Sequence, residues 1–458
     1  MQGAIAAGHP LTADAGAAVL RAGGNAVDAC IAAAAVAWVC ESPLTGPGGG
    51  GFLLVHEAES GRSRLLDFFV AVPERPAAHD ELLELAVDFD GDTRQVFHTG
   101  AAAVAVPGTA LGLWEAHRRF GTVPWPELLA PAARLAREGV VLTRQQAYLH
   151  RILDPLLRHS PEGDAMYGPG RALEAGERFR LPELAETLGR LAAEGGGCLY
   201  RGELAERLAA HAALTPDDLA RYEVLEREPL AAPFRGGEFR TNPPPSSGGR
   251  LLAVGLDALG EADPTPLAVA HAMEAQEAAR VGGTGGTTHV SVVDGAGDAA
   301  SLSSSLGSGS GVVVPGTGIH LNNMLGEADL AGDGRPGDRL TSMMAPSLLL
   351  HEGRLRLVIG SAGSVRLRGA ILQVVANVAA RRLGVREAVE APRIHVEEGV
   401  AHCEDAAAAG ELEEAGYPVV RWRGRNLFFG GVAAVEVRDD GSLAAAGDPR
   451  RGGEGRVV

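Results

Sequence analysis

The apolar pattern of the first sixty residues predicts two helices followed by a strand. Thr12 can cap a helix that runs through Leu20, and Asn25 then opens a second, alanine-rich helix. The glycine-dense stretch 46–51 leads into the short apolar run 52–55, whose residue types are those of a strand. The glycines do not follow the GxGxxG spacing and no helix comes after them, so dinucleotide binding is not indicated.

The rest of the chain changes from helical to strand-like periodicity. From residue 108 to about 232, leucine and alanine recur every three or four residues, which predicts mostly helices. Further helices are expected at 251–259, 266–280 and 368–383, and strands at 287–294, 299–306, 346–351, 354–360 and 431–438. Helices packed on strand-rich layers predict an α+β layered fold.

Composition narrows the possible functions. The chain has 458 residues, a formal net charge of −17 and no lysine, so all 41 basic residues are arginine. The negative charge argues against nonspecific binding to nucleic acid or to anionic membranes. The missing lysine excludes Schiff-base and P-loop lysine chemistry. Four scattered cysteines form no CxxC, so neither a disulfide framework nor a zinc site is expected.

The N-terminus and the longest apolar run bear on location. Residues 1–10 lack the positive region of a signal peptide. The longest apolar run, 29–40, is about 12 residues, which suits a buried helix better than a membrane span. These features predict a cytoplasmic protein.

The junction at residues 285–289, Gly-Gly-Thr-Thr-His, is a candidate for self-cleavage. Cutting between Gly286 and Thr287 would give Thr287 a free α-amino group with an ordinary pKa of about 7.7–8.0. That amine could accept the proton of the hydroxyl on the same residue, so nucleophile and base would belong to one residue. The same five residues also suit a plain loop leading into a strand.

Eleven segments in the same order give the chain a specific resemblance. They are 9–12, 23–29, 46–51, 106–108, 121–125, 214–222, 243–249, 287–294, 318–323, 391–395 and 447–450. Together they resemble the γ-glutamyltransferases, which are self-processing N-terminal-nucleophile hydrolases. The resemblance implies a four-layer αββα fold and no cofactor. It also implies a heterodimer of the self-cleaved chains 1–286 and 287–458.

The resemblance also implies catalytic roles. Thr287 matches the nucleophile that cleavage after Gly286 releases, and Ser305 falls where the family usually has a second threonine that positions it. Gly363 and Ser364 match the glycine pair whose backbone N–H groups form the oxyanion hole. The segment between Arg280 and Thr287 is six residues long, where the family has tens.

The substrate-binding positions depart from the family. Phe69 stands in place of the arginine that grips the substrate carboxylate, and Gly307 in place of an asparagine. The chain keeps Asn323, loses a polar contact at Met324, and offers Glu327 as a substitute for the final aspartate. Thr341 and Ser342 match the serine pair that binds the substrate carboxylate. An altered, more apolar acyl pocket is therefore expected.

These features predict an acyl hydrolase or transferase of the γ-glutamyltransferase type that acts on a small molecule and releases the acyl group to water or to an acceptor amine. Two alternatives stay open. Some members of the family that serve antibiotic pathways are thought to cleave a C–C bond next to a carbonyl during alkylproline formation. A non-catalytic binding protein that never matures is the other alternative, because the segment before Thr287 is short.

Overall fold

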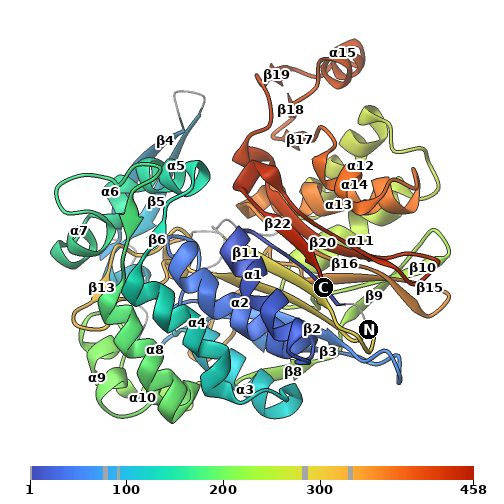
Figure 1. Ribbon diagram of the computed structural model, residues 1–458. Coiled ribbons are helices and arrows are strands. Elements are labelled where there is room, and N and C mark those ends of the chain that lie inside the picture. Colours follow the sequence, from blue (N-terminus) through green and yellow to red (C-terminus); the bar gives the residue numbers. More distant parts are fainter. Residues whose placement is uncertain (1–2, 76–80, 90–92, 281–286, 328–333) are drawn as a thin grey trace.

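The chain folds into two β-sheets stacked between two layers of helices (Figure 1). The computed structural model describes residues 3–75, 81–89, 93–280, 287–327 and 334–458. Within them, the first sheet has seven strands in the order β22-β1-β11-β12-β2-β3-β8, and the second has six in the order β21-β20-β16-β15-β10-β9.

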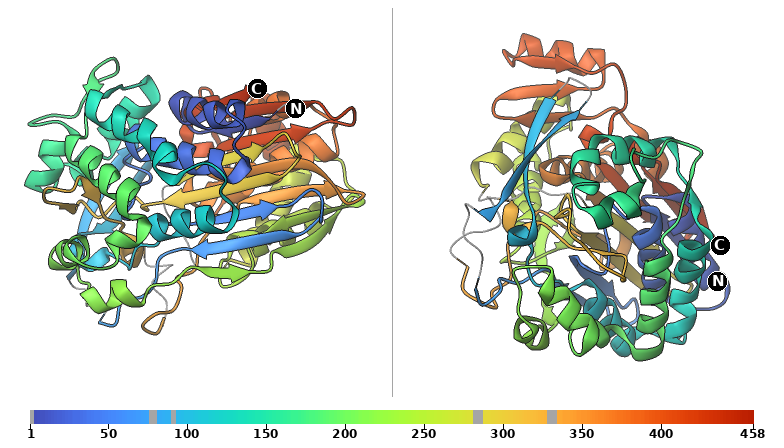
Figure 2. Two further views of the ribbon diagram at one scale, coloured as in Figure 1. Left: turned by 60° about the horizontal axis from the view of Figure 1, so that its bottom comes forward. Right: turned by 90° about the vertical axis from the view of Figure 1, so that its left-hand side faces the viewer.

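The first sheet brings together strands from both ends of the chain. Its strands are β1 (Ala4–Ala7), β2 (Gly50–His56), β3 (Ser63–Phe68), β8 (Leu225–Arg227), β11 (Thr288–Val293), β12 (Ala299–Ser305) and β22 (Glu454–Val457). The N-terminal strand β1 pairs with β11 on one side and with β22 on the other, in both cases antiparallel. Both views in Figure 2 accordingly show the two termini side by side.

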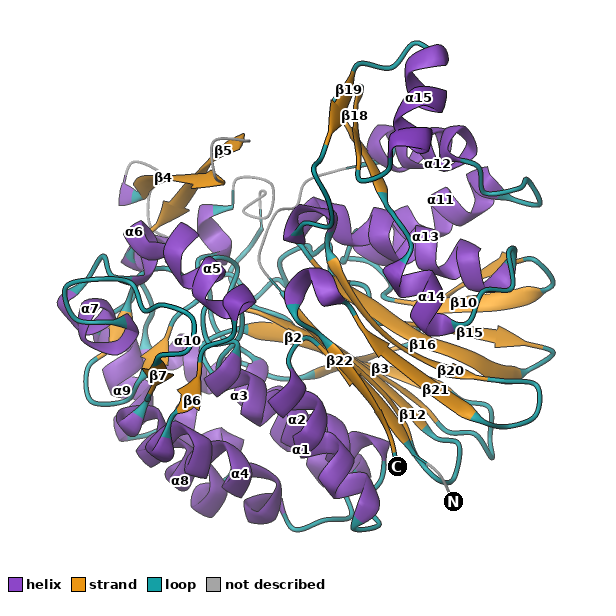
Figure 3. Ribbon diagram, turned by 45° about the horizontal axis from the view of Figure 1, so that its top comes forward, coloured by secondary structure: helices purple, strands orange, loops and turns teal. Residues whose placement is uncertain are grey.

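Helices α1 (Pro10–Arg21) and α2 (Ala26–Cys40) cover the outer face of this sheet, with α3 (Thr109–Phe120), α4 (Trp125–Glu138) and α8 (Pro182–Glu194) beside them (Figure 3). Every residue of α2 is buried, because this helix lies between the sheet and other helices. Asn25 and Asp28 form a capping box that starts α2. Asp28 also accepts hydrogen bonds from Thr122, which fixes the connection between α3 and α4.

The second sheet carries its own helix layer. Its strands are β9 (Leu230–Phe234), β10 (Gly237–Thr241), β15 (Ser347–His351), β16 (Arg354–Ala362), β20 (Gly431–Val437) and β21 (Leu443–Gly447). The helices of this layer are α11 (Gly248–Leu259), α12 (Pro266–Ala278), α13 (Leu367–Ala379) and α14 (Val385–Glu390). Strands β11 and β12 of the first sheet pack on β16 of the second, so the two sheets enclose the centre of the molecule.

Smaller elements surround this sandwich. The remaining helices are α5 (Arg144–Ile152), α6 (Asp154–Leu157), α7 (Pro161–Tyr167), α9 (Glu203–Ala210), α10 (Pro216–Arg221) and α15 (Ala406–Glu414). The remaining strands are β4 (Leu83–Phe89), β5 (Thr93–Thr99), β6 (Val140–Val141), β7 (Arg178–Phe179), β13 (Val313–Val314), β14 (Ile319–His320), β17 (Ile394–Glu397), β18 (Val400–Cys403) and β19 (Val419–Arg421). Among the residues that the structure describes, none of the helices is both long and apolar enough to cross a bilayer.

The architecture confirms the predicted α+β class and the four-layer αββα arrangement. Several predicted elements differ in detail. The first helix begins at Pro10 with His9 as its cap, rather than with Thr12. The region 108–232, predicted as mostly helical, also contains the short strands β6, β7 and β8 and the start of β9.

Candidate active site

Thr287 lies directly before β11, and only 2% of it is exposed. In the β11–β12 ladder Thr288 pairs with Ser304, so continuing the register by one residue places Ser305 opposite Thr287. Ser305 is buried, and its Oγ accepts a hydrogen bond from the backbone N–H of Gly307 at 2.8 Å. The structure thus brings together the predicted nucleophile and the residue predicted to position it.

His289, two residues further along β11, shows which way this face of the strand points. Its ring lies against β16, because a Cβ at Gly360 would come within 2.3 Å of it. The side chains of Thr287 and His289 share a face by strand alternation, so Thr287 faces the second sheet. Burial lowers the pKa of His289 to about 3. Its two ring nitrogens are bonded to the hydroxyls of Ser303 and Ser291, so we interpret it as a neutral structural group.

A small cavity adjoins Thr287 between the ends of the two sheets. Its volume is about 10 Å³, roughly the space of one water molecule. The residues that line it are Gly8, Glu41, Leu44, Gln146, Leu149, Thr287, Thr288, His289, Ala362, Gly431, Val432, Ala433, Asp448 and Arg451. The cavity has room for about one water molecule, and its lining includes three ionisable groups, the carboxyl groups of Glu41 and Asp448 and the guanidinium of Arg451.

Glu41 is the buried carboxyl group at the end of α2. It accepts hydrogen bonds from the hydroxyls of Thr12 at 3.0 Å and of Thr288 at 2.6 Å. Burial raises the pKa of Glu41, while these two hydrogen bonds and the charge of Arg451 oppose the rise. Glu41 therefore ties α1 and α2 to the residue that follows Thr287.

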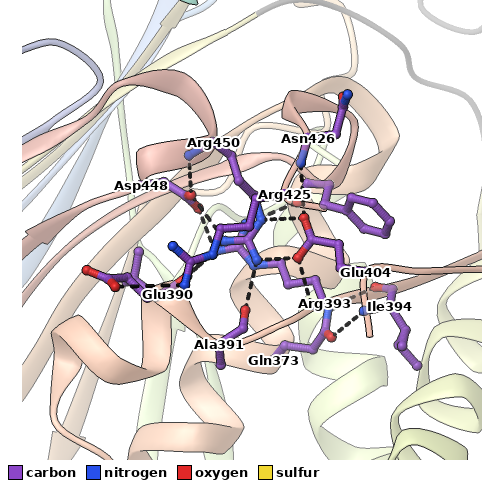
Figure 4. Close-up of polar contacts among 12 residues, drawn as sticks. Gln373, Glu390, Ala391, Arg393, Ile394, Glu404, Arg425, Asn426, Asp448 and Arg450 are labelled. Atoms are coloured by element: carbon purple, nitrogen blue, oxygen red, sulfur yellow. Dashed lines mark hydrogen bonds and ion pairs between the residues drawn. The ribbon is translucent and has the colours of Figure 1, made fainter. Parts of the chain in front are cut away.

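Arg451 lines the same cavity from the turn after β21. Burial lowers its pKa to about 10, against the opposing charges of Asp448 and Glu41, so the guanidinium stays charged at neutral pH. Nε and Nη1 are buried and, among the described residues, have no hydrogen-bond acceptor. The residues just before Arg451 are held by an ionic network (Figure 4). Asp448 lies 2.6 Å from Arg393 and 3.2 Å from Arg450, and Arg450 also bonds Glu404.

Gly363 and Ser364 form a turn directly after β16. Both have positive φ, +131° and +58°, and this left-handed region is unusual for the non-glycine Ser364. A Cβ at Gly363 would lie 2.7 Å from Cα of Gly430 and 3.3 Å from Nη2 of Arg451. A side chain at position 363 would therefore displace backbone, which explains why glycine is required there.

Three of the predicted substrate-binding residues meet around Gly307. This residue has φ +72°, and a Cβ on it would come 2.0 Å from Oδ1 of Asn323 and 3.0 Å from Oε1 of Glu327. Asn323 is fixed by hydrogen bonds with Ser308 in both directions. The asparagine that the resemblance would put at position 307 has no room in this arrangement.

Phe69 and Met324 lie in an apolar cluster between the sheets. Phe69 is 1% exposed and its ring stacks on Phe52, with ring centroids 5.4 Å apart. Its backbone N–H donates to Asp67, whose carboxylate also lies within ion-pair distance of Arg227 and Arg339. The position of the expected carboxylate-binding arginine is thus occupied by core packing in this structure.

Thr341 and Ser342 are held by the proline- and serine-rich segment 243–249. The hydroxyl of Thr341 donates to the carbonyl of Pro245 at 3.0 Å. The carbonyl of Ser342 accepts from the hydroxyl of Ser246 and from two backbone N–H groups, those of residues 247 and 248. Their own polar groups are therefore largely satisfied within the protein.

The predicted residues form separate groups rather than one pocket. Thr287, Ser305 and the 363–364 turn lie at the facing ends of the sheets, whereas Phe69 and Met324 are in the core and do not line the Thr287 cavity. Gly286 lies outside the described residues. Sequence reasoning missed Glu41 and Arg451. Each had a weak signal: Glu41 is a charge directly after a long apolar run, and Arg451 directly follows the matched segment 447–450.

Comparisons with known proteins identify the family of the chain. The family model described as gamma-glutamyltranspeptidase matches residues 12–281 and 260–458. The acylase ACY 1 proenzyme of Pseudomonas sp. (strain SE83) is 34% identical over 97% of this chain and 91% of its own length. The glutathione hydrolase proenzyme of Pseudomonas aeruginosa is 32% identical over 100% of this chain and 94% of its own. A cephalosporin acylase from Bacillus halodurans has a similar crystal structure, with a TM-score of 0.87 at 26% identity over 99% of this chain and 95% of its own. The chain therefore belongs to the gamma-glutamyltranspeptidase family of hydrolases and acyltransferases.

Proposed function

We propose that the chain is a self-processing acylase whose nucleophile is Thr287 after cleavage between Gly286 and Thr287. The observation that carries the proposal is the placement of Thr287: a buried threonine directly before β11, opposite Ser305 and beside a small cavity between the sheet ends. The names of two relatives, acylase proenzyme and glutathione hydrolase proenzyme, support the same chemistry. Cleavage would leave chains of 286 and 172 residues joined as a heterodimer.

The mechanism uses groups of the protein alone. The neutral α-amine of Thr287, with an ordinary pKa of about 7.7–8.0, accepts the proton of its own hydroxyl. Oγ1 then attacks the substrate carbonyl, and the backbone N–H groups of Gly363 and Ser364 stabilise the oxyanion. The leaving amine takes the proton, and water or an acceptor amine releases the acyl group from the ester. Ser305 orients the nucleophile.

We further propose that the acyl group is not the γ-glutamyl group of glutathione. Three features support this: Phe69 replaces the expected arginine and is packed in the core, Met324 lies in the same apolar cluster, and Gly307 leaves no room for an asparagine. A charge-assisted hydrogen bond contributes about 1.5–3 kcal/mol. Loss of the arginine alone should therefore reduce kcat/KM for a γ-glutamyl anilide by about tenfold to a hundredfold.

Self-cleavage and acyl transfer can be tested on the purified protein. Wild type should separate on a denaturing gel into two chains, and mass spectrometry should place the cut after Gly286. Thr287→Ala should remain one chain, whereas Thr287→Ser, which keeps a hydroxyl, should still cleave. Exposure to an acyl anilide should add one acyl mass to the smaller chain only.

The same experiment separates the alternatives. A wild type that stays intact would contradict self-processing and favour a non-catalytic binding protein. Cleavage of Thr287→Ala at the same bond would show that another group does the chemistry. A matured enzyme that forms no ester with any amide, but does with a substrate that loses a carbon leaving group, would favour C–C bond hydrolysis.

A further inference from the structure

We propose that a cavity in the helix layer of the second sheet binds a free α-amino acid with a short apolar side chain. This site goes beyond the proposed function, because the residues that line it and those that line the Thr287 cavity are different. It does not depend on Thr287 being the nucleophile. The size of the cavity, its apolar walls and its opposite charges carry the proposal.

The cavity lies where a small unit of the chain meets the helix layer. Strands β17, β18 and β19 form a sheet of their own, and β17 and α15 pack on α12 (Figure 1). Residues at the start of α12, on α13 and on α15 line the cavity. Its volume is about 180 Å³, which about six water molecules occupy in the liquid. A single amino acid is of this size, whereas drug-sized ligands need cavities of about 300 Å³ or more.

Hydrogen bonds across this contact fix the walls of the cavity. The side chain of Gln373 on α13 bonds both backbone groups of Ile394, donating to its carbonyl and accepting from its N–H at 3.0 Å each. Glu411 on α15 accepts from the backbone N–H of Leu267 at 2.9 Å. The fold itself therefore forms the cavity, so a ligand can bind without the cost of ordering its walls.

Part of the lining is apolar. Pro264, Pro266 and Pro392 line the cavity, and proline has no backbone N–H that would need an acceptor there. Val269 and Ala408 are buried and belong to the same lining. Because burying apolar surface is favourable, these walls favour a ligand with a short apolar side chain.

Two arginines that line the cavity have donors that the fold does not fully use. Arg393 is 2% exposed, and its Nη1 and Nη2 donate to backbone carbonyls and to Asp448. Its Nε is buried and has no acceptor among the described residues. Arg381 is bonded to a backbone carbonyl and, at 3.5 Å, to Asn377, and the exposed carboxylate of Asp263 is 4.0 Å away. A carboxylate in the cavity would give these guanidinium groups the acceptor that they lack.

Asp405 adds the opposite charge to the lining. Its Oδ2 accepts from the backbone N–H groups of residues 407 and 408 at 3.0 Å and so caps α15. In the part of the chain that the structure describes, no basic side chain pairs with it. A lone carboxylate in the cavity would meet this second negative charge, and a lone amine would leave Nε of Arg393 without an acceptor. A zwitterion satisfies both groups.

Calorimetric titration of the Thr287→Ala protein tests the site without turnover. We expect one L-valine to bind per chain with a Kd of about 1 mM or tighter. Isovalerate lacks only the amino group of valine, and isobutylamine lacks only its carboxylate. Each should bind at least about tenfold more weakly than L-valine. Absence of L-valine binding, or equal affinity for all three compounds, would overturn the proposal.

Two variants divide the site by charge. Asparagine also caps helices, so Asp405→Asn should keep the start of α15. It should weaken L-valine about tenfold without weakening isovalerate, which has no ammonium group to lose. Arg381→Gln should weaken L-valine and isovalerate by about threefold to tenfold, because Arg381 is partly exposed, without weakening isobutylamine. Arg382→Gln, an exposed neighbour outside the lining, should change none of the three. A loss that either cavity variant shows equally for all three compounds would contradict the assigned charges.

Filling the cavity tests where the ligand lies. Ala408→Leu adds a larger side chain to the lining, whereas Ala407→Leu adds the same side chain to the exposed face of α15. L-valine binding should be lost in Ala408→Leu and kept in Ala407→Leu. Binding that persists in a folded Ala408→Leu protein would place the ligand elsewhere and overturn the assignment. If Ala408→Leu does not fold, the variants at Asp405 and Arg381 decide the question alone.

Discussion

Two groups of buried charges meet at residues 448–451 and differ in how their charges are paired. In the paired cluster, formed by Arg393, Glu404, Asp448 and Arg450, every charged side chain contacts an opposite charge (Figure 4). In the Thr287 cavity, by contrast, Arg451 has buried nitrogens without an acceptor. Burial disfavours a charge in both places. Only the paired cluster compensates that penalty within the folded protein.

This difference in charge pairing indicates different roles for the two groups. The paired cluster joins β17 and the turn after β18 to the turn after β21, so it holds the backbone at Asp448 and Arg450. The cluster therefore fixes the position of the next residue, Arg451, which lines the Thr287 cavity. A buried charge without a close partner lowers stability, and such charges are frequent at functional sites.

Breaking the paired cluster should have the largest effect. Asp448→Ala leaves Arg393 and Arg450 buried with less compensation, so we expect the free energy of unfolding to fall by about 3–5 kcal/mol. The measurement is denaturant unfolding in the Thr287→Ala background, in which the protein should stay one chain. Asp439→Ala, which removes the exposed partner of Arg356, should cost less than about 1 kcal/mol. Similar losses of unfolding free energy in both variants would show that the paired cluster contributes no more to stability than an exposed ion pair.

The pH dependence of stability should show that Glu41 is buried without full compensation. Burial raises the pKa of Glu41 above its ordinary value of 4.5. Between the two pKa values the folded protein holds a proton that the unfolded chain has released, so this group lowers the unfolding free energy as pH rises through that window. Glu41→Gln should therefore gain stability relative to the parent as pH increases from about 4.5. The exposed Glu59→Gln should show no such trend, and a difference that stays flat with pH in Glu41→Gln would contradict the prediction.

The smallest effect is expected for stability in Arg451→Gln. The lost guanidinium has no close partner, so the change should stay within about 1 kcal/mol of the parent. Arg393→Gln, which breaks the contact with Asp448, should cost about 3–5 kcal/mol in the same assay. Equal costs would mean that Arg451 contributes as much to the stability of the fold as Arg393 does.

The fold was predicted best where one sequence pattern extended over many consecutive residues. The apolar run at 29–40 identified α2, and the alternation at 287–294 and 299–306 identified the hairpin of β11 and β12. Strands β1 and β22 were missed because each has four residues, which is too few for a period-two pattern to stand out. Their pairing depends on partners about 290 and 450 residues away in the sequence.

The site was predictable only in part, for a related reason. Thr287 was predicted from its glycine-rich junction and the family resemblance, and Gly363 and Ser364 were predicted from the resemblance alone. Glu41 and Arg451 come close to Thr287 through the packing of distant elements. No local sequence pattern indicates that they lie near it. Phe69 was expected at the substrate site from the resemblance alone. Packing between two aromatic rings places it in the core instead.

The order of strands in the first sheet means that the fragments left by the proposed cut could not readily reassemble after they had separated. Strand β1 would belong to the larger fragment, yet it lies between β11 and β22 of the smaller one, and β2 pairs with β12. Separated fragments would each expose unpaired strand edges, which aggregate readily. The intact chain closes these pairings within one molecule, whereas two fragments must find each other from dilute solution. Once cut, the enzyme would stay folded because its two fragments separate slowly, and not because separated fragments could refold together.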